Sequence, residues 1–193
     1  MILPIIAFGD KVLRKKCIDI DKDYPDLEKL ITNMRETMDN ASGVGLAAPQ
    51  INKAIRLFLI DTSPFAEDED LTKEEQTFLK NFNKVFINAK ITKETGEEWV
   101  FNEGCLSIPN IREDVFRKDT ITIEYLDENF KKHKDTLTGL ASRVVQHEYD
   151  HIEGILFTDL LSSLKKKLLK KKLEKISKGK VSVDYRMKFP LAK

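Results

Sequence analysis

The sequence predicts an α+β domain, because two kinds of hydrophobic periodicity occupy different parts of the chain. Apolar residues alternate as in half-buried strands in several segments before residue 135, whereas helical spacing dominates after it. The chain has 193 residues, a length that fits one domain. A hydrophobic content of 41% and a net charge of +1 exclude disorder over most of the chain.

Composition also excludes two other classes of protein. Two cysteines cannot provide the disulfide framework of a small secreted module, and the N-terminal MILPIIAF lacks the basic segment of a signal peptide. No apolar run approaches the roughly 20 residues needed to cross a bilayer. We therefore expect a soluble, cytoplasmic protein with no membrane partner.

A first helix is expected over residues 25–40, where Asp-Tyr-Pro at 23–25 is typical of a helix start. Its apolar residues follow at helical spacing: Leu27, Leu30, Ile31, Met34 and Met38. The helix ends at the Ala-Ser-Gly of 41–43, and a β-prone run follows at 55–60.

Further strands are expected over residues 85–91, 99–101 and 121–125, with a loop at Glu103 after the second. The acidic segment 66–83 is interpreted as a surface excursion between strands. Within it, Thr72 and Glu75 have the spacing of a capping box that begins a short helix.

The second strong helix begins near Thr138, and one continuous stripe on it consists of Leu140, Val144, His147 and His151. Unpaired imidazoles are costly to bury, so both histidines need a partner. The pentapeptide 147–151, His-Glu-Tyr-Asp-His, is an HExxH sequence, in which two imidazoles one turn apart can bind one metal ion beside the glutamate. A pair of hydrogen-bonded core histidines is the alternative interpretation.

A catalytic metal site of this kind needs a third protein ligand. Upstream, His133 lies in a Lys-rich, turn-like stretch, and the downstream sequence offers mainly Glu153 and Glu174. Cys105 follows a glycine, and a thiolate is a strong ligand for Zn²⁺ or Fe²⁺. Cys17 is expected to be a buried, inert thiol.

A third segment, 43–50, has the sequence GVGLAAPQ. Its lone GxG is weak evidence for a phosphate-binding loop, and a turn of small residues packed under a helix is the alternative. Pro49 stiffens the chain, and Gln50 carries an amide group that can polarise a carbonyl oxygen.

GVGLAAPQ at 43–50, EGCLS at 103–107 and HEYDH at 147–151 together resemble, in order and spacing, the three signature motifs of bacterial peptide deformylase. The resemblance implies small antiparallel β-sheets packed around a central metal-binding helix, followed by a C-terminal helix. It also implies a metallohydrolase that removes the formyl group from the N-terminal formyl-methionine of nascent chains. Fe²⁺ is the native metal in that family, with Zn²⁺ or Ni²⁺ as substitutes, whereas ligand chemistry alone favours Zn²⁺.

The resemblance also assigns roles to individual residues. The metal ligands are Cys105, His147 and His151. Glu148 is the general base that takes a proton from metal-bound water and delivers it to the leaving amine. The oxyanion hole consists of the Gln50 side chain and the backbone N–H of Leu106.

Substrate contacts are expected from the Val44-Gly45 backbone, which pairs with the extended peptide, and from Arg112, which helps to hold the peptide main chain. Candidates for the methionine pocket, equally suited to an ordinary core, are Val44, Phe101, Leu140 and Val144. Candidates for a charge network that orients the ligands are Glu103, Arg117 and Asp150, with a plain cluster of ion pairs as the alternative.

Two other classes of function use the same residues. A zincin-like endoprotease would have a metal ligand downstream of His151 and would cleave internal peptide bonds. A non-catalytic metal-binding or ribosome-associated protein would show no deformylation that depends on Glu148.

Charge is distributed unevenly along the chain. Residues 164–193 carry a net charge of +10 and residues 1–163 a net charge of −9. We expect a catalytic domain over 1–160, with 161–193 forming a basic C-terminal helix and tail of the same single-domain unit. A polyanionic partner is one explanation of the basic tail, and a solvated helix is the other.

The C-terminal helix, expected over 160–176, has two apolar stripes. The first, expected to pack on the body of the protein, consists of Leu161, Leu164 and Leu168. The second, expected to stay uncovered, consists of Leu169, Leu173 and Ile176. It is flanked by lysines that could contact ribosomal RNA through phosphates, namely Lys170, Lys171, Lys172 and Lys175.

Two segments depart from the family pattern. The excursion at 62–83 is longer than in a compact deformylase, and the extension at 177–193 has no assigned place. Alternation of Val181, Val183 and Tyr185 suggests that the extension adds a strand.

Overall fold

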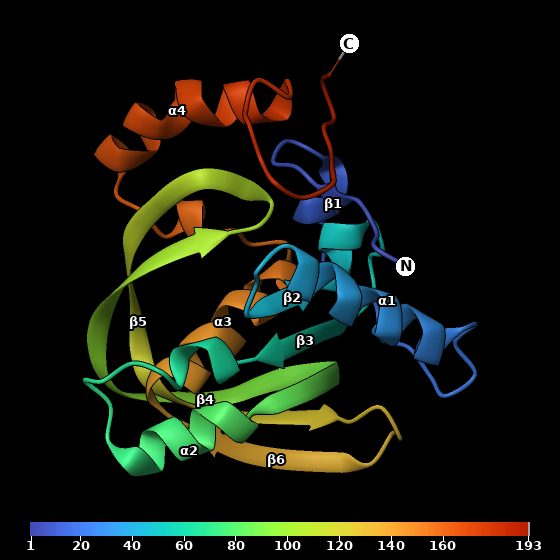
Figure 1. The fold of residues 1–193 in the computed structure, drawn as a ribbon, viewed down its shortest axis with the longest axis vertical. Coiled ribbons are helices and arrows are strands. Elements are labelled where there is room, and N and C mark those ends of the chain that lie inside the picture. Colours follow the sequence, from blue (N-terminus) through green and yellow to red (C-terminus); the bar gives the residue numbers. More distant parts are fainter. Residues whose placement is uncertain (193) are drawn as a thin grey trace.

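The structure, a computed structural model, describes residues 1–192. Five antiparallel strands form the main sheet in the order β2-β3-β4-β5-β6, and β1 pairs with β7 in parallel (Figure 1). The strands are β1 Ile5–Ile6, β2 Gly45–Ala47, β3 Leu57–Asp61, β4 Asn83–Cys105, β5 Ile108–Leu126, β6 Lys132–Leu137 and β7 Met187–Lys188. The α-helices are α1 Leu27–Asn40, α2 Lys73–Asn81, α3 Gly139–Glu153 and α4 Ser163–Ser177.

Helix α3 lies at the centre of the fold, with the strands of the main sheet around it (Figure 1). Strands β4 and β5 form a long hairpin whose ladder contains several register shifts, and such irregularities allow a sheet to bend. Apolar residues of α3, including Val145 and Ile152, are fully buried in one cluster with Phe58, Phe86 and Ile121 of the sheet. The predicted α+β class, with antiparallel strands around the HExxH helix, is confirmed.

The predicted strands at 85–91 and 99–101 belong to the single strand β4, so the expected loop at Glu103 is wrong. Glu103 is instead paired within the β4–β5 ladder. The turn-like interpretation of the stretch around His133 is also wrong, because His133 lies in β6 opposite Tyr125. Its many lysines point to solvent from an edge strand, which explains why hydrophobicity gave no signal.

Helix α1 begins two residues later than predicted, at Leu27, and buries Met34 and Met38 completely. The capping box of α2 is confirmed, since Thr72 Oγ1 accepts from Glu75 N–H and Glu75 Oε2 accepts from Thr72 N–H. The excursion is not purely a surface feature, because Leu79 and Phe82 join the main apolar cluster. Cys17 is buried as expected, and burial raises the pKa of its thiol to about 11.

The prediction for the two stripes of α4 is wrong for five of its six residues. Leu164 and Leu168 are 68% and 69% exposed, and only Leu161 of the first stripe is buried. The buried residues of the second stripe are Leu169, Leu173 and Ile176. They pack with Ala7, Ile108 and Ile111. The face of α4 that was predicted to stay uncovered is therefore the one that faces the N-terminal segment and the start of β5.

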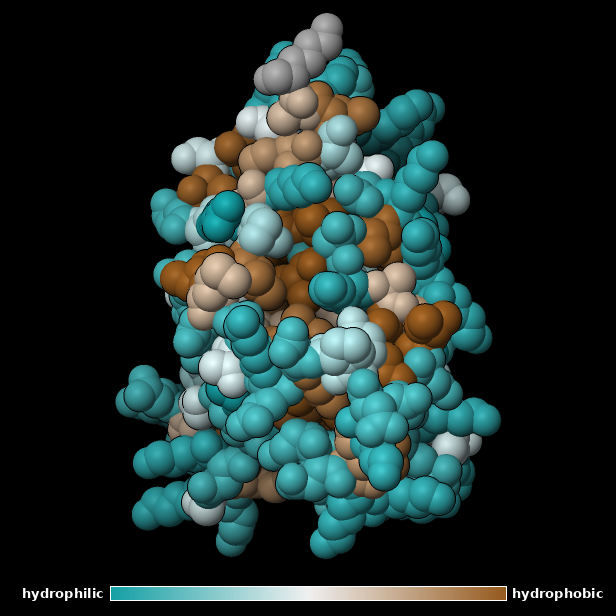
Figure 2. Space-filling model, turned by 90° about the vertical axis from the view of Figure 1, so that its right-hand side faces the viewer, coloured by the Kyte–Doolittle hydropathy of each residue, from teal (hydrophilic) through white to brown (hydrophobic). Residues whose placement is uncertain are grey.

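The extension after α4 returns along the N-terminal strand and adds β7 to β1. A strand is therefore present, but it begins at Met187, after the alternating residues that suggested it. Figure 2 shows the side of the molecule that faces right in Figure 1, where apolar side chains gather in the upper and middle parts and hydrophilic ones cover most of the lower part. Within residues 1–192, no helix is long and apolar enough to span a membrane.

Candidate active site

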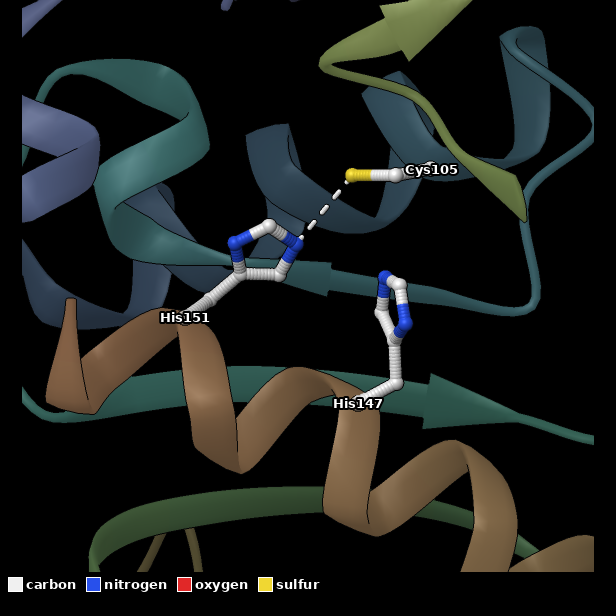
Figure 3. A group of neighbouring side chains, drawn as sticks. All are labelled: Cys105, His147 and His151. Carbon is white, nitrogen blue, oxygen red and sulfur yellow. Dashed lines mark hydrogen bonds between the residues drawn. The ribbon is translucent and has the colours of Figure 1, made fainter. Parts of the chain in front are cut away.

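Three side chains that can bind a metal converge where β4 ends against α3 (Figure 3). The ligand atoms of Cys105, His147 and His151 all lie within 4.8 Å of one another. The two imidazoles are one turn apart on α3, so both point to the same side of the helix, toward the last residue of β4. Cys105 Sγ lies 3.3 Å from His151 Nε2.

The residues of this cluster fit a metal ion. One thiol sulfur and two imidazole nitrogens form a donor set that suits Zn²⁺ or Fe²⁺ and leaves a coordination position open. Beside it, Glu148 Oε2 is buried with no hydrogen-bond partner among residues 1–192. A buried, unpaired carboxylate oxygen is costly, so this atom is suited to accept a proton from a water molecule at the cluster.

Glu148 lies on α3 beside His147 and is 4% exposed. Strand β2 passes so close to it that a Cβ atom on Gly45 would lie 2.5 Å from Glu148 Oε1. Only glycine permits this approach, which explains the second glycine of the GVG sequence. Burial raises the pKa of the Glu148 carboxyl to about 7.

Glu103 supports the cluster as a buried acceptor of four hydrogen bonds, one of them from Arg117 Nη2 at 3.1 Å. Arg117 Nε donates at 2.7 Å, Arg143 Nη1 at 3.0 Å and His147 Nδ1 at 2.9 Å. Burial acts to raise the pKa of Glu103, but the hydrogen bonds with His147 and Arg117 outweigh it and hold this pKa well below its usual range. The ionised carboxylate fixes the His147 proton on Nδ1 and leaves Nε2 free to bind a metal.

Arg117 links this network to Asp150, whose Oδ2 accepts from Nη1 at 2.7 Å. The predicted trio of Glu103, Arg117 and Asp150 therefore lies together behind the metal-binding residues. Ion pairs of this kind hold their members in place only if every buried charge is paired, and Glu103 and Arg117 meet that condition.

Gln50 lies in the 3₁₀ turn Ala48–Ile51, directly after β2, and is 1% exposed. Its Oε1 accepts from the Ala47 N–H at 2.8 Å. This contact directs Nε2 toward Cys105 Sγ at 3.6 Å and Ser107 Oγ at 3.3 Å. Leu106 lies between these two residues in the turn that joins β4 to β5.

A cleft of about 730 Å³ opens in front of the cluster. Its lining includes most of the predicted substrate-binding residues, namely Val44, Gly45, Phe101, Arg112 and Val144. Leu140 is not among the lining residues and packs instead against the main apolar cluster. Arg112 is exposed, and its Nε donates to Asn102 Oδ1 at 3.1 Å.

Several residues of the cleft were not predicted from the sequence. Arg143 lies one turn before His147 on α3, is 1% exposed and has its guanidinium 4.4 Å from the Trp99 ring centroid. A charged residue on the same helical face as the histidines was the available signal. The other missed residues include Pro64 and Phe65, from the excursion, and Tyr185, from the C-terminal extension.

The fold and the Cys-His-His cluster with its neighbouring glutamate define a metal-dependent hydrolase. The family model described as polypeptide deformylase matches residues 2–167. Proteins named peptide deformylase from Christiangramia forsetii and Flavobacterium johnsoniae are 66% and 62% identical to this chain over its full length, covering 98% of each relative. This chain belongs to the peptide deformylase family.

Solved structures agree with this assignment. The peptide deformylase from Legionella pneumophila has a TM-score of 0.78 at 36% identity, covering 93% of this chain and 98% of that one. The enzyme from Synechococcus elongatus, in complex with actinonin, has a TM-score of 0.74 at 32% identity, covering 96% and 91%. Family membership decides against the endoprotease and the non-catalytic protein.

Proposed function

We propose that this protein hydrolyses the N-terminal formyl group of formyl-methionyl polypeptides and releases formate. The observation that carries the proposal is the convergence of Cys105, His147 and His151 beside the unpaired Glu148 carboxylate, in a chain of the peptide deformylase family. Water adds to the formyl carbon, the C–N bond breaks, and the products are formate and a free amino group.

Cys105, His147 and His151 would hold the metal ion, and Fe²⁺ is the ion we propose, with Zn²⁺ or Ni²⁺ as substitutes. When bound, a dication supplies Lewis acidity, which lowers the pKa of water and polarises a carbonyl oxygen. Glu103 and Arg117 keep the ligands oriented, because Glu103 fixes the protonation of His147.

Glu148 acts as the general base. Its unpaired Oε2 takes a proton from the attacking water, and the same carboxyl then delivers that proton to the leaving amine. The close approach of Gly45 holds the carboxylate in place. No other carboxyl group among residues 1–192 lies both beside the metal cluster and without a hydrogen-bond partner.

The Gln50 amide and the backbone N–H of Leu106 stabilise the negative charge that develops on the formyl oxygen. Support for Gln50 comes from the Ala47 contact, which turns its NH₂ group toward Cys105. Replacing Gln50 with Ala should lower kcat by about 10²–10³-fold. The metal content should not change, because all three ligands remain.

The substrate would lie in the cleft with its methionine side chain between Val44, Phe101 and Val144. The backbone of Val44 and Gly45 would pair with the peptide main chain as an added strand, and Arg112 would bind the main chain at the cleft mouth. Leu140, which does not line the cleft, would support Val144 from the core.

We further propose that the enzyme acts in the cytoplasm on chains emerging from the ribosome. Residues 1–160 would form the catalytic part, and 161–193 a basic helix and tail of the same unit. Support comes from α4, whose exposed lysines surround the exposed Leu164 and Leu168. Charge reversal of Lys170, Lys171, Lys172 and Lys175 should abolish co-sedimentation with ribosomes at low salt, and unchanged co-sedimentation would exclude this contact.

The central experiment is formate release from a formyl-Met peptide by protein purified anaerobically with Fe²⁺. Anaerobic handling matters because ferrous iron beside a thiolate invites oxidation. Formate release with no cleavage of internal peptide bonds is the expected result. Absence of formate from protein with confirmed metal content would refute the proposed function.

A further inference from the structure

The C-terminal extension is tied down along its length rather than loosely attached. Arg186 O and Lys188 O accept hydrogen bonds from Ile5 N–H and Ala7 N–H, both at 2.9 Å. The Leu191 N–H donates to Ser177 O at 2.9 Å, at the end of α4. The segment between these anchors therefore has a defined position relative to the β1 strand and α4.

The part of the extension that precedes β7 forms one wall of the active-site cleft. Residues 182–185 line the cleft together with Gly43, Leu106 and Asn110 from the two signature segments and β5. Asn110 Nδ2 donates to Ser182 O at 3.0 Å, which holds this wall against β5. Half-buried Tyr185 and Leu106 pack against the same buried apolar cluster.

The Tyr185 hydroxyl reaches the backbone beside the metal cluster. Tyr185 Oη donates to the carbonyl oxygen of Leu106 at 2.8 Å. In the same turn, the Ser107 carbonyl accepts from the Phe8 N–H at 2.8 Å, and Ser107 Oγ contacts Gln50 Nε2 at 3.3 Å. The turn is thus held from three directions, by the C-terminal extension, the N-terminal segment and Gln50.

The contact with the Leu106 carbonyl constrains the neighbouring N–H group. Each residue has only two freely rotating backbone angles, because the peptide units are planar. On one side of Leu106, Cys105 is fixed by the β4–β5 ladder, and on the other side Tyr185 fixes the carbonyl. The direction of the Leu106 N–H is therefore set by the β4–β5 ladder on one side and by the Tyr185 hydroxyl on the other.

We propose that Tyr185 is a positioning residue for deformylation, and that it acts by holding the Leu106 backbone so that its N–H faces the formyl oxygen. This inference rests on the proposed function. It also gives the C-terminal extension a role in the active site, as a strap that begins beyond α4, passes the oxyanion side of the cleft at Tyr185 and continues into β7.

The test is Tyr185→Phe, which removes the hydroxyl but keeps the packed ring. The matched control is Tyr24→Phe, because Tyr24 is also half-buried and its hydroxyl makes no hydrogen bond within residues 1–192. Tyr185→Phe should lower kcat by about three- to tenfold with little change in KM, since one neutral hydrogen bond is lost. Metal content should match that of the wild-type protein and of the control.

A second readout does not depend on activity. Amide hydrogen exchange of a peptide that spans residues 103–110 should become faster in Tyr185→Phe and stay unchanged in Tyr24→Phe, at equal melting temperature. If the wild-type protein releases formate and Tyr185→Phe has the same kcat, the inference is overturned. Unchanged exchange at 103–110 would overturn it as well. A wild-type protein that releases no formate would refute the proposed function, while the exchange data would still decide whether Tyr185 holds the turn.

Discussion

Helices α3 and α4 each have fifteen residues. Helix α3 buries polar side chains, whereas α4 leaves large apolar side chains exposed. Buried polar residues of α3 include Arg143, Gln146, Glu148 and His151. In α4, by contrast, Leu164 and Leu168 are more than two-thirds exposed. Hydropathy alone would place both sets of side chains on the wrong side of the protein surface.

The difference shows that partners, rather than residue type, decide burial in this fold. Gln146 Nε2 donates to the Lys118 carbonyl at 2.9 Å, and Arg143 Nη2 donates to the Trp99 carbonyl at 2.7 Å. Such contacts offset the cost of removing polar groups from water. The α3 helix can therefore lie at the centre of the protein and carry the chemistry there.

Helix α4 follows a simpler rule, because it packs through one apolar stripe only. Its buried leucines pack on the apolar surface near Ala7, Ile108 and Ile111. The leucines on the other side have no such surface within residues 1–192 and stay exposed among lysines. Polar contacts thus specify α3, whereas the position of an apolar surface specifies α4.

The largest expected effect lies in Glu148. Its Oε2 is one of three buried side-chain atoms of α3 without a hydrogen-bond partner, together with Arg143 Nε and His151 Nδ1. Glu148→Gln should lower kcat by about 10²–10⁴-fold, because a neutral amide cannot take the proton from water. Metal content, measured by elemental analysis, should be unchanged. Formate release measured at saturating formyl-Met peptide tests the prediction.

Glu153→Gln is the matched control on the same helix, since Glu153 Oε1 pairs with Arg56 Nη1 at 2.5 Å, outside the metal cluster. It should retain nearly wild-type turnover. Equal turnover in Glu148→Gln and the wild-type protein would contradict the assignment of the base.

A second effect should appear in stability rather than in turnover. Arg143→Met keeps much of the side-chain volume but removes the donors to Glu103, Val115 and Trp99. We expect a loss of about 3 kcal/mol in the free energy of unfolding, because buried acceptors lose their partners. Urea unfolding of the metal-loaded protein measures it, and a change below about 0.5 kcal/mol would mean that the buried network of α3 does not determine its position.

Prediction from sequence succeeded where one short segment contained the whole signal. The HExxH helix and the capping box of Thr72 are local patterns, and both are present in the structure. The three motif segments do lie together at the cleft, although no spacing in the sequence places Cys105 beside α3. Thiolate chemistry made Cys105 the candidate for the third ligand, and the family resemblance then assigned it that role.

Prediction failed where packing between distant segments decided the outcome. Register shifts interrupt the alternation of β4, so one long strand was interpreted as two short ones and a loop. The rotation of α4 depends on the apolar surface near Ala7, which lies at the other end of the chain. The role of Tyr185 could not be predicted for the same reason, because it depends on a hydrogen bond with the Leu106 carbonyl, which is distant in sequence.

Adjacent leucines of α4 provide a sharper test of the comparison. Leu169 is 5% exposed and Leu168 is 69% exposed, so the two differ in environment but not in chemistry. Leu169→Ala should cost about 2 kcal/mol, the low end for a buried leucine, because the cavity borders the surface. Leu168→Ala should change stability by less than about 0.5 kcal/mol. Thermal unfolding of both variants measures the difference. Equal losses would mean that α4 does not bury Leu169 and expose Leu168 in solution.

The smallest effect is expected from the charges of α4, through Glu174 and Lys178. Their side chains are 56% and 43% exposed, and the hydrogen bond with Lys178 lowers the pKa of Glu174. A lowered pKa in the folded state stabilises the protein above the unfolded pKa, about 4.3 for glutamate, and this contribution is lost as the pH falls below it. Glu174→Gln should therefore melt slightly below the wild-type protein at pH 7 and together with it at pH 3.

High salt should remove the difference at pH 7 as well, because exposed charges are screened. A difference that persisted in both conditions would show that Glu174 acts through packing. In that case a polar side chain of α4 would be held by its contacts with the protein, as the polar side chains of α3 are.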